Sequence, residues 1–178
     1  MDTGETRALM ERLAAKDAIA AVLTRYCRAV DLCDEAMMRS CYWPEASDDH
    51  GVYAGPAGGF VDFVIPLLRG MRRTVHYLSN IEVVERGADW AAVQSCYFAL
   101  HDMAEPEGPV TLTIGGRYLD RFEQRGGEWR ILTRLATMDW NGRGPSTGAW
   151  EEGAVFALRQ GRRHPEDSFY DWRAAQTP

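Results

Sequence analysis

His76 and Asp31 are the residues whose types and surroundings best suit acid–base chemistry. His76 lies among the β-forming and small polar residues of positions 73–80, which predict the start of a strand. Asp31 follows the apolar residues at the end of a predicted helix. A carboxylate that binds an imidazole fixes its tautomer and stabilises the imidazolium that forms when the ring takes a proton. The two residues therefore predict a general base in which Asp31 orients His76.

The helix that positions Asp31 is predicted over residues 6–30. Its apolar residues recur at the spacing of one helical face, namely Ile19, Val22, Leu23, Tyr26 and Val30. At about 100° per residue, Cys27 and then Asp31 fall at the border of this face. Asp31 is therefore expected to be half buried, although an ordinary polar role at a helix end is the alternative.

Two shorter helices are predicted before the sheet. Residues 34–42 form one of them, with Asp34 as its N-cap, and Trp43-Pro44 is expected to end it. Residues 60–68 carry an apolar run that predicts the other, and Pro66 indicates a kink or an end there.

A segment of unusual polarity lies between these helices. Residues 45–53 predict a short strand that carries Asp48, Asp49 and His50 in succession, and residues 54–59 predict a turn. Such a strand either lies at an exposed edge or supplies polar groups to a cavity. The sequence leaves both interpretations open.

The second half of the chain predicts a sheet. Four segments are rich in Val, Thr, Tyr and Trp, and the short turns between them predict an antiparallel meander. The predicted strands are residues 74–85, 90–103, 110–123 and 129–140. Three helices followed by such a sheet define an α+β fold, in which a curved sheet folds around a helix face.

Alternation along the strands gives two more candidates for a site. On residues 90–103, His101 points the same way as Tyr97, and both faces are largely apolar, as in an interior strand. Arg134 shares a predicted face with Leu132, Ala136 and Met138. A guanidinium with such neighbours needs an anion, a carboxylate or a substrate oxygen, and Asp31 and Asp139 are the carboxylates considered as its partner.

Length and charge exclude several classes of protein. A chain of 178 residues with 46% hydrophobic residues fits one globular domain. Its net charge of −6 argues against nucleic-acid binding, because no Lys/Arg stripe exists to displace phosphate counterions. The short basic groups Arg72-Arg73 and Arg159 to Arg163 are interpreted as solvated surface.

Targeting and metal signals are missing from the sequence. No apolar run approaches a membrane span and the N-terminus does not read as a signal peptide, so a cytoplasmic location without a membrane partner is expected. The spacing of Cys27, Cys33, Cys41 and Cys96 predicts buried free thiols rather than a disulfide framework or a metal site. No cofactor motif is found, so we expect no cofactor and no metal.

The C-terminal part is predicted as an extension. Residues 1–144 form the predicted domain and 145–178 the extension, with a short helix expected around 151–159. Phe169, Tyr170 and Trp172 need an apolar environment, either over the domain's own cavity or on a neighbouring subunit.

Several stretches together resemble the SnoaL-like branch of the nuclear transport factor 2 like superfamily. They are Val30-Asp31, Asp48-Asp49-His50-Gly51, Gly55-Pro56, residues 74–80, and the strand after Gly127-Glu-Trp129-Arg130. The resemblance covers about residues 8–141. It implies a cone-shaped α+β barrel, in which three helices pack on a strongly bent sheet around a deep apolar pocket.

Within that branch, the chain is most similar to dehydratases and dehydrochlorinases, a group that holds scytalone dehydratase, hexachlorocyclohexane dehydrochlorinase and bile-acid 7α-dehydratase. The resemblance implies that Asp31 and His76 form their catalytic dyad. It further implies supporting roles for Tyr26, His101, Arg134 and His50 in binding or acid–base chemistry. It also implies a homo-oligomer, with a trimer preferred and a dimer as the alternative.

The leading hypothesis is therefore a cofactor-independent lyase that acts on a small, apolar, cyclic substrate. His76 would take the proton, and Tyr26, His101 or Arg134 would bind or protonate the leaving oxygen. The first alternative is a ligand carrier or a structural subunit like the dioxygenase β chain, which needs no dyad. A ketosteroid-type isomerase, with Asp102 or Asp139 as base, ranks lower.

Overall fold

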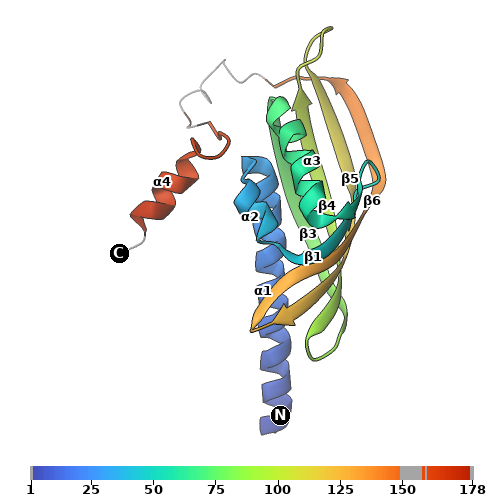
Figure 1. The fold of residues 1–178 in the computed structure, drawn as a ribbon, viewed down its shortest axis with the longest axis vertical. Coiled ribbons are helices and arrows are strands. Elements are labelled where there is room, and N and C mark those ends of the chain that lie inside the picture. Colours follow the sequence, from blue (N-terminus) through green and yellow to red (C-terminus); the bar gives the residue numbers. More distant parts are fainter. Residues whose placement is uncertain (1, 149–157, 159, 177–178) are drawn as a thin grey trace.

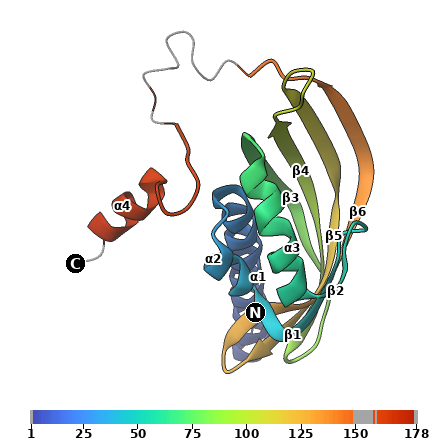
Figure 2. The ribbon, with the colours of Figure 1, turned by 45° about the horizontal axis from the view of Figure 1, so that its top comes forward.

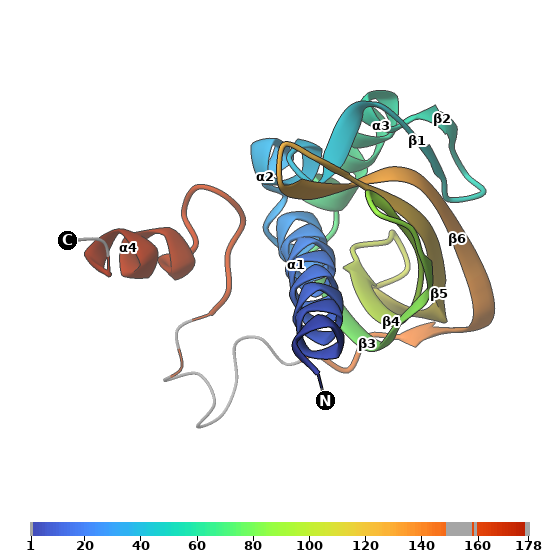
Figure 3. The same cartoon turned by 90° about the horizontal axis from the view of Figure 1, so that it is seen from below.

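The computed structural model describes residues 2–148, 158 and 160–176. Within these residues, four helices and six strands follow one another in the order α1, α2, β1, β2, α3, β3, β4, β5, β6, α4 (Figure 1). Seen from below, the sheet curves around α1 and α3, which occupy its concave side (Figure 3). The predicted α+β fold with a strongly curved sheet is confirmed.

Helix α1 (Thr3–Leu32) is the long element on which Asp31 lies. A capping box begins it, because the Asp2 side chain accepts from the Glu5 N–H and the Glu5 side chain accepts from the Asp2 N–H. Cys33 ends it in the left-handed region at φ 52°, with its N–H bonded to the Val30 carbonyl. The predicted apolar face is confirmed, because all five of its residues are buried.

Helix α2 (Glu35–Arg39) packs on α1 and α3, and helix α3 (Ala57–Gly70) packs on strands β1 and β2. The N-cap role of Asp34 is confirmed, since its side chain accepts from the Met37 N–H at 2.9 Å. Helix α3 is longer than predicted and contains Pro66 within its span.

Two predictions for the segment between the helices are wrong. Strand β1 (Tyr42–Asp49) begins earlier than predicted and runs through Pro44, and β2 (Ala54–Pro56) is a strand where a turn was expected. Pro44 has no N–H to donate, and it is tolerated because the pairing of β1 with β6 skips from Tyr42 to Ser47.

The sheet has the strand order β2-β1-β6-β5-β4-β3. Strands β3 (Arg73–Arg86), β4 (Trp90–Met103), β5 (Val110–Arg125) and β6 (Glu128–Pro145) form the predicted antiparallel meander. Strand β1 joins β6 in parallel and β2 in antiparallel orientation. The sheet is open at β2 and β3, so the expected barrel is a cone with unjoined edges.

Two bulges in β6 set which side chains point inward. Arg121 pairs with Thr133 but Phe122 pairs with Ile131, so Leu132 is an extra residue. Ile131, rather than the predicted Leu132, therefore shares the inner face with Arg134. The second bulge, at Asp139, bends the strand where Gly115 and Gly116 of β5 face it.

Helix α4 (Ser168–Ala175) stands beside the ends of α1 and α2, apart from the sheet (Figure 2). The helix predicted around residues 151–159 lies almost wholly outside the described residues. The predicted division of the chain at residue 144 stays a prediction.

Candidate functional site

Asp31 and His76 form a tightly held pair at the end of α1. Asp31 Oδ1 lies 2.7 Å from His76 Nδ1, and Asp31 Oδ2 accepts the main-chain N–H of His76 at 2.9 Å. The His76 side chain is 8% exposed and that of Asp31 is 24% exposed. One carboxylate therefore fixes both the backbone and the ring of the same residue.

This geometry selects one tautomer of His76. An ionised Asp31 accepts a hydrogen bond from the ring Nδ1–H, so the Nε2 lone pair is left to take a proton. The carboxylate also stabilises the imidazolium that would follow. The pair can act as a base without any change in its hydrogen bonds.

His101 lies directly beside this pair. Its ring is 5.3 Å from the ring of His76, centroid to centroid, in an edge-on arrangement. Burial, with smaller contributions from His76 and Arg163, lowers the pKa of His101 to about 4. At neutral pH a neutral imidazole therefore faces the base, and its buried Nδ1 has no hydrogen-bond partner among the described residues.

A groove opens onto the Asp31–His76 pair between α1 and β3. Its volume is about 470 Å³. Its walls are Thr24, Cys27, Arg28, Asp31, Leu32, His76, Tyr77, Leu78 and Phe169. The pair thus lies at a groove whose lining is largely apolar, and one lining residue, Phe169, comes from α4.

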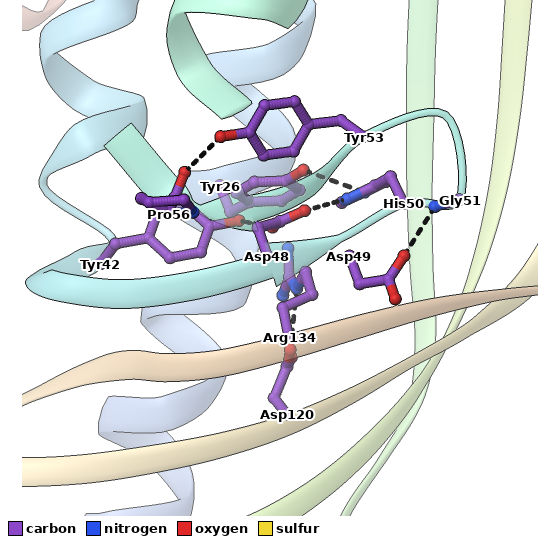
Figure 4. Close-up of polar contacts among 10 residues, drawn as sticks. All are labelled: Tyr26, Tyr42, Asp48, Asp49, His50, Gly51, Tyr53, Pro56, Asp120 and Arg134. Carbon is purple, nitrogen blue, oxygen red and sulfur yellow. Dashed lines mark hydrogen bonds and ion pairs between the residues drawn. The ribbon is translucent and has the colours of Figure 1, made fainter. Parts of the chain in front are cut away.

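The other predicted site residues come together in a second cluster on the inner face of the sheet (Figure 4). Tyr26 Oη lies 3.5 Å from His50 Nε2, and His50 Nδ1 bonds Asp48. Asp48 in turn accepts from Tyr42 Oη at 2.7 Å. The open question of the polar segment is thereby answered: Asp48 points inward and is buried, and Asp49 caps the Gly51 N–H.

Arg134 is fully buried in this cluster, and the partners predicted for it are wrong. Asp120 of β5, rather than Asp31 or Asp139, binds it through two 2.8 Å hydrogen bonds, and both side chains are 0% exposed. The guanidinium also lies between the rings of Tyr26 and Tyr118, 4.1 Å from each centroid. The bulge at Leu132 brings Arg134 opposite Asp120, which sequence alternation alone could not reveal.

The buried cluster holds its tyrosines in the neutral form. Burial raises the pKa of Tyr26, and the charge of Asp48 adds to that shift while Arg134 opposes it. Burial likewise raises the pKa of Asp120, against the opposing charge of Arg134. The cluster is therefore a stable hydrogen-bonded core whose phenols are proton donors.

Sequence reasoning missed two residues that contact these groups. The inward direction of Asp120 could have been predicted from the sequence, since alternation on β5 puts it on the same face as Tyr118 and Phe122. No sequence pattern indicates a structural role for Arg163, and its interpretation as solvated surface is wrong. Its guanidinium donates hydrogen bonds to Thr74 Oγ1 at 2.7 Å and to the carbonyl oxygens of Asp31 and Leu68.

The described part of the chain carries neither a metal-binding cluster nor a membrane-spanning helix. Within it, no three or more His, Cys, Asp or Glu side chains are grouped so that they could hold a metal ion. None of the helices described is long and apolar enough to cross a membrane. The four cysteines are free thiols, and three of them are buried as predicted, whereas Cys96 is only partly buried.

Comparison with known proteins assigns both a class and a family. The curved, helix-backed meander is the cone fold of the nuclear transport factor 2 like proteins. The sequence profile of the SnoaL-like domain matches residues 11–135, and the chain belongs to that family.

Individual relatives agree with this assignment. Hexachlorocyclohexane dehydrochlorinase 1 of Sphingobium indicum is 27% identical over 135 residues, which cover 74% of this chain and 86% of that protein. The crystal structure of LinA superimposes with a TM-score of 0.68 at 23% identity, covering 78% of this chain and 94% of that one. A scytalone dehydratase-like structure from Novosphingobium aromaticivorans gives a TM-score of 0.62 at 16% identity, with 86% and 95% covered.

Proposed function

We propose that this protein is a cofactor-independent lyase that eliminates a leaving group from a small, largely apolar, cyclic substrate. The observation that carries the proposal is the double hydrogen bond from Asp31 to His76. The similarity to dehydrochlorinases supports the same type of reaction. The apolar walls of the groove beside the pair support the choice of substrate class.

The proposed reaction begins with proton transfer to His76. Nε2 takes a proton from a substrate carbon, the C–H electron pair forms the double bond, and the leaving group departs from the neighbouring carbon with its own bonding pair. Asp31 stabilises the imidazolium that results. A positioned base of this kind contributes about 10² to 10⁴ in rate.

We assign His101 to interaction with the leaving group, because its ring lies next to that of His76. It is neutral at working pH and lies next to His76, so it can donate a hydrogen bond without competing for the substrate proton. In the buried cluster Tyr26 hydrogen-bonds His50, and the guanidinium of Arg134 lies over the Tyr26 ring. We assign them to supporting the inner face behind the site.

An elimination assay tests the proposal. The wild-type protein and His76→Ala are incubated with small cyclic chlorides and with cyclic β-hydroxy ketones, and alkene products are measured by mass spectrometry. We expect turnover of one class by the wild type and its loss in His76→Ala. Binding of these compounds without turnover, unchanged in His76→Ala, would instead show a ligand carrier.

The two carboxylates considered for the isomerase alternative are not placed to act as its base. Asp139 is half exposed and ion-paired with Arg117 at 2.8 Å. Asp102 lies next to His101 on β4 and therefore points to the opposite face, where Arg72 lies 3.4 Å away. Neither carboxylate faces the groove.

We further propose that the outer face of the sheet binds copies of the same chain. Tyr77, Phe98 and Trp140 follow one another across β3, β4 and β6, all three are exposed, and Phe98 stacks on Trp140. Such a row of aromatic rings is typical of a self-association surface. Light scattering should give the mass of a trimer for the wild type and a smaller mass for Trp140→Glu, and a monomeric wild type would overturn the proposal.

A further inference from the structure

Arg163 of the C-terminal segment joins three elements at the end of α1. Its guanidinium bonds the Asp31 carbonyl on α1, the Leu68 carbonyl near the end of α3 at 3.2 Å, and Thr74 Oγ1 on β3 at 2.7 Å. Two of these acceptors are carbonyl groups in the last turns of helices, where further intrahelical donors are missing, and the Leu68 carbonyl also accepts the N–H of the C-cap residue Met71. A cation is favourable there because the carbonyl ends of both helices carry partial negative charge.

These contacts flank the Asp31–His76 pair on both sides. Asp31 supplies the carboxylate that holds His76, and Thr74 lies two residues before His76 on the same face of β3. Arg163 thereby ties the backbone of the carboxylate-bearing residue to the strand that carries the base. A shift of either element would break a bond to the same guanidinium.

The remainder of the segment is fastened to the same end of α1. The His164 N–H bonds the Leu32 carbonyl at 2.6 Å, and Tyr170 Oη donates to Asp34 at 2.7 Å. The guanidinium of Arg28 lies 4.9 Å from the ring centroid of Phe169, which forms a wall of the groove at Asp31 and His76. Residues 160–176 therefore meet the site at two points, through Arg163 and through Phe169.

We propose that Arg163 is a positioning residue for the Asp31–His76 pair and that Phe169 selects the substrate at the groove. The segment that carries both lies outside residues 11–135, which match the family profile. The proposal rests on the proposed function of the pair, and it adds a part of the site that the family-wide region of the chain does not contain.

The first test needs no substrate. Titration of the histidine rings by NMR in the full chain compares the wild type with Arg163→Ala and the matched control Arg162→Ala, which removes the neighbouring charge. In Arg163→Ala, we expect the low-field Nδ1–H signal of His76 to broaden through faster exchange. The pKa of His101 should rise, because the charge of Arg163 lowers it. Arg162→Ala should leave both unchanged.

Two further variants keep this test decisive. Arg163→Lys retains the charge but not the fork of donors, so it should preserve the His101 titration and only part of the Nδ1–H protection. Thr74→Val removes one acceptor with little change of shape, and it serves if Arg163→Ala does not fold. Equal behaviour of the Arg163 and Arg162 variants would overturn the positioning role.

The second test measures turnover of a substrate found in the elimination assay. Arg163→Ala should lower kcat about 10- to 100-fold with a smaller effect on KM, while Phe169→Ala should change mainly KM and the preference among ring sizes. An unchanged substrate preference in Phe169→Ala would overturn its assigned role. If the wild type catalyses no elimination, the proposed function fails, whereas the ring titrations still decide the role of Arg163.

Discussion

The carboxylate of Asp31 receives both N–H groups of His76, the ring Nδ1–H at 2.7 Å and the main-chain N–H at 2.9 Å. Two bonds to one residue fix the distance between helix α1 and strand β3 as well as the direction of the imidazole. The arrangement leaves Nε2 as the atom that can take a proton. It explains how a long helix and a strand far along the chain form a single base.

Asp31→Asn should abolish this base while keeping the fold. An amide oxygen can accept the main-chain N–H, but the amide NH₂ would then face Nδ1 and favour the wrong tautomer of His76. We expect kcat on an identified substrate to fall by about 10² or more. Asp17→Asn, an exposed position on the same helix, is the control. Activity of Asp31→Asn within a few-fold of the wild type would show that the pair is structural.

His101 should make stability depend on pH in a defined window. Its pKa is about 4 in the folded protein and 6.5 in the unfolded chain, so between these values the unfolded state binds the additional proton. The free energy of unfolding therefore falls as the pH is lowered from 6.5 to 4, by up to about 3 kcal/mol. Above pH 6.5 both states are neutral and this contribution is constant.

Denaturant unfolding of wild type and His101→Gln at several pH values measures this contribution. The stability difference between the two proteins should change steadily across the window and level off above it. Parallel curves for wild type and variant from pH 6.5 to 4 would contradict the buried, neutral state of His101.

Much of the fold could be predicted from the sequence, because the periodicity of apolar residues and the positions of turn residues are local signals. The buried face of α1 and the four strands of the meander followed from such patterns. The bulge at Leu132 was not accessible, because an extra residue in a strand has no fixed sequence signature and changes every facing side chain after it. For that reason Arg134 was predicted on the correct strand but with the wrong partner.

The candidate site was predictable only in part, for a related reason. Asp31 and His76 could be paired through helix and strand periodicity and a family resemblance. Arg163 could not, since its contacts with Asp31 and Thr74 depend on how the C-terminal segment returns to the domain. A polar segment that packs back onto a distant part of the chain shows no apolar periodicity from which the contact could be predicted.

Gly116→Ala should strongly destabilise the protein. A Cβ at Gly116 would lie 1.9 Å from the Thr137 carbonyl oxygen and 2.9 Å from Tyr97 Oη, which donates to that same oxygen. The second bulge of β6 creates this close approach, so relief requires movement of backbone. We expect a loss of more than about 3 kcal/mol in the free energy of unfolding. Gly144→Ala is the control, since open space surrounds its Cβ position, and a similar effect at both sites would refute the argument.

The buried ion pair of Arg134 and Asp120 should be far more sensitive than an exposed pair of the same type. Arg134→Met leaves the Asp120 carboxylate buried without its two hydrogen bonds, at a cost of about 3–5 kcal/mol in the free energy of unfolding. Arg117→Ala removes the partner of Asp139 in a pair that is open to solvent, so its effect on the free energy of unfolding should be much smaller.

A double-mutant cycle separates this pairing from packing. In Arg134→Met the Asp120 carboxylate is buried without a partner, and Asp120→Asn removes that charge. The double variant should therefore lose less stability than the sum of the two single variants. The loss of stability that remains in the double variant measures the contact of the guanidinium with the rings of Tyr26 and Tyr118. Additive losses, or an effect of Arg134→Met no greater than that of Arg117→Ala, would mean that Asp120 is neutral in the folded protein and that the cluster is held by its tyrosines alone.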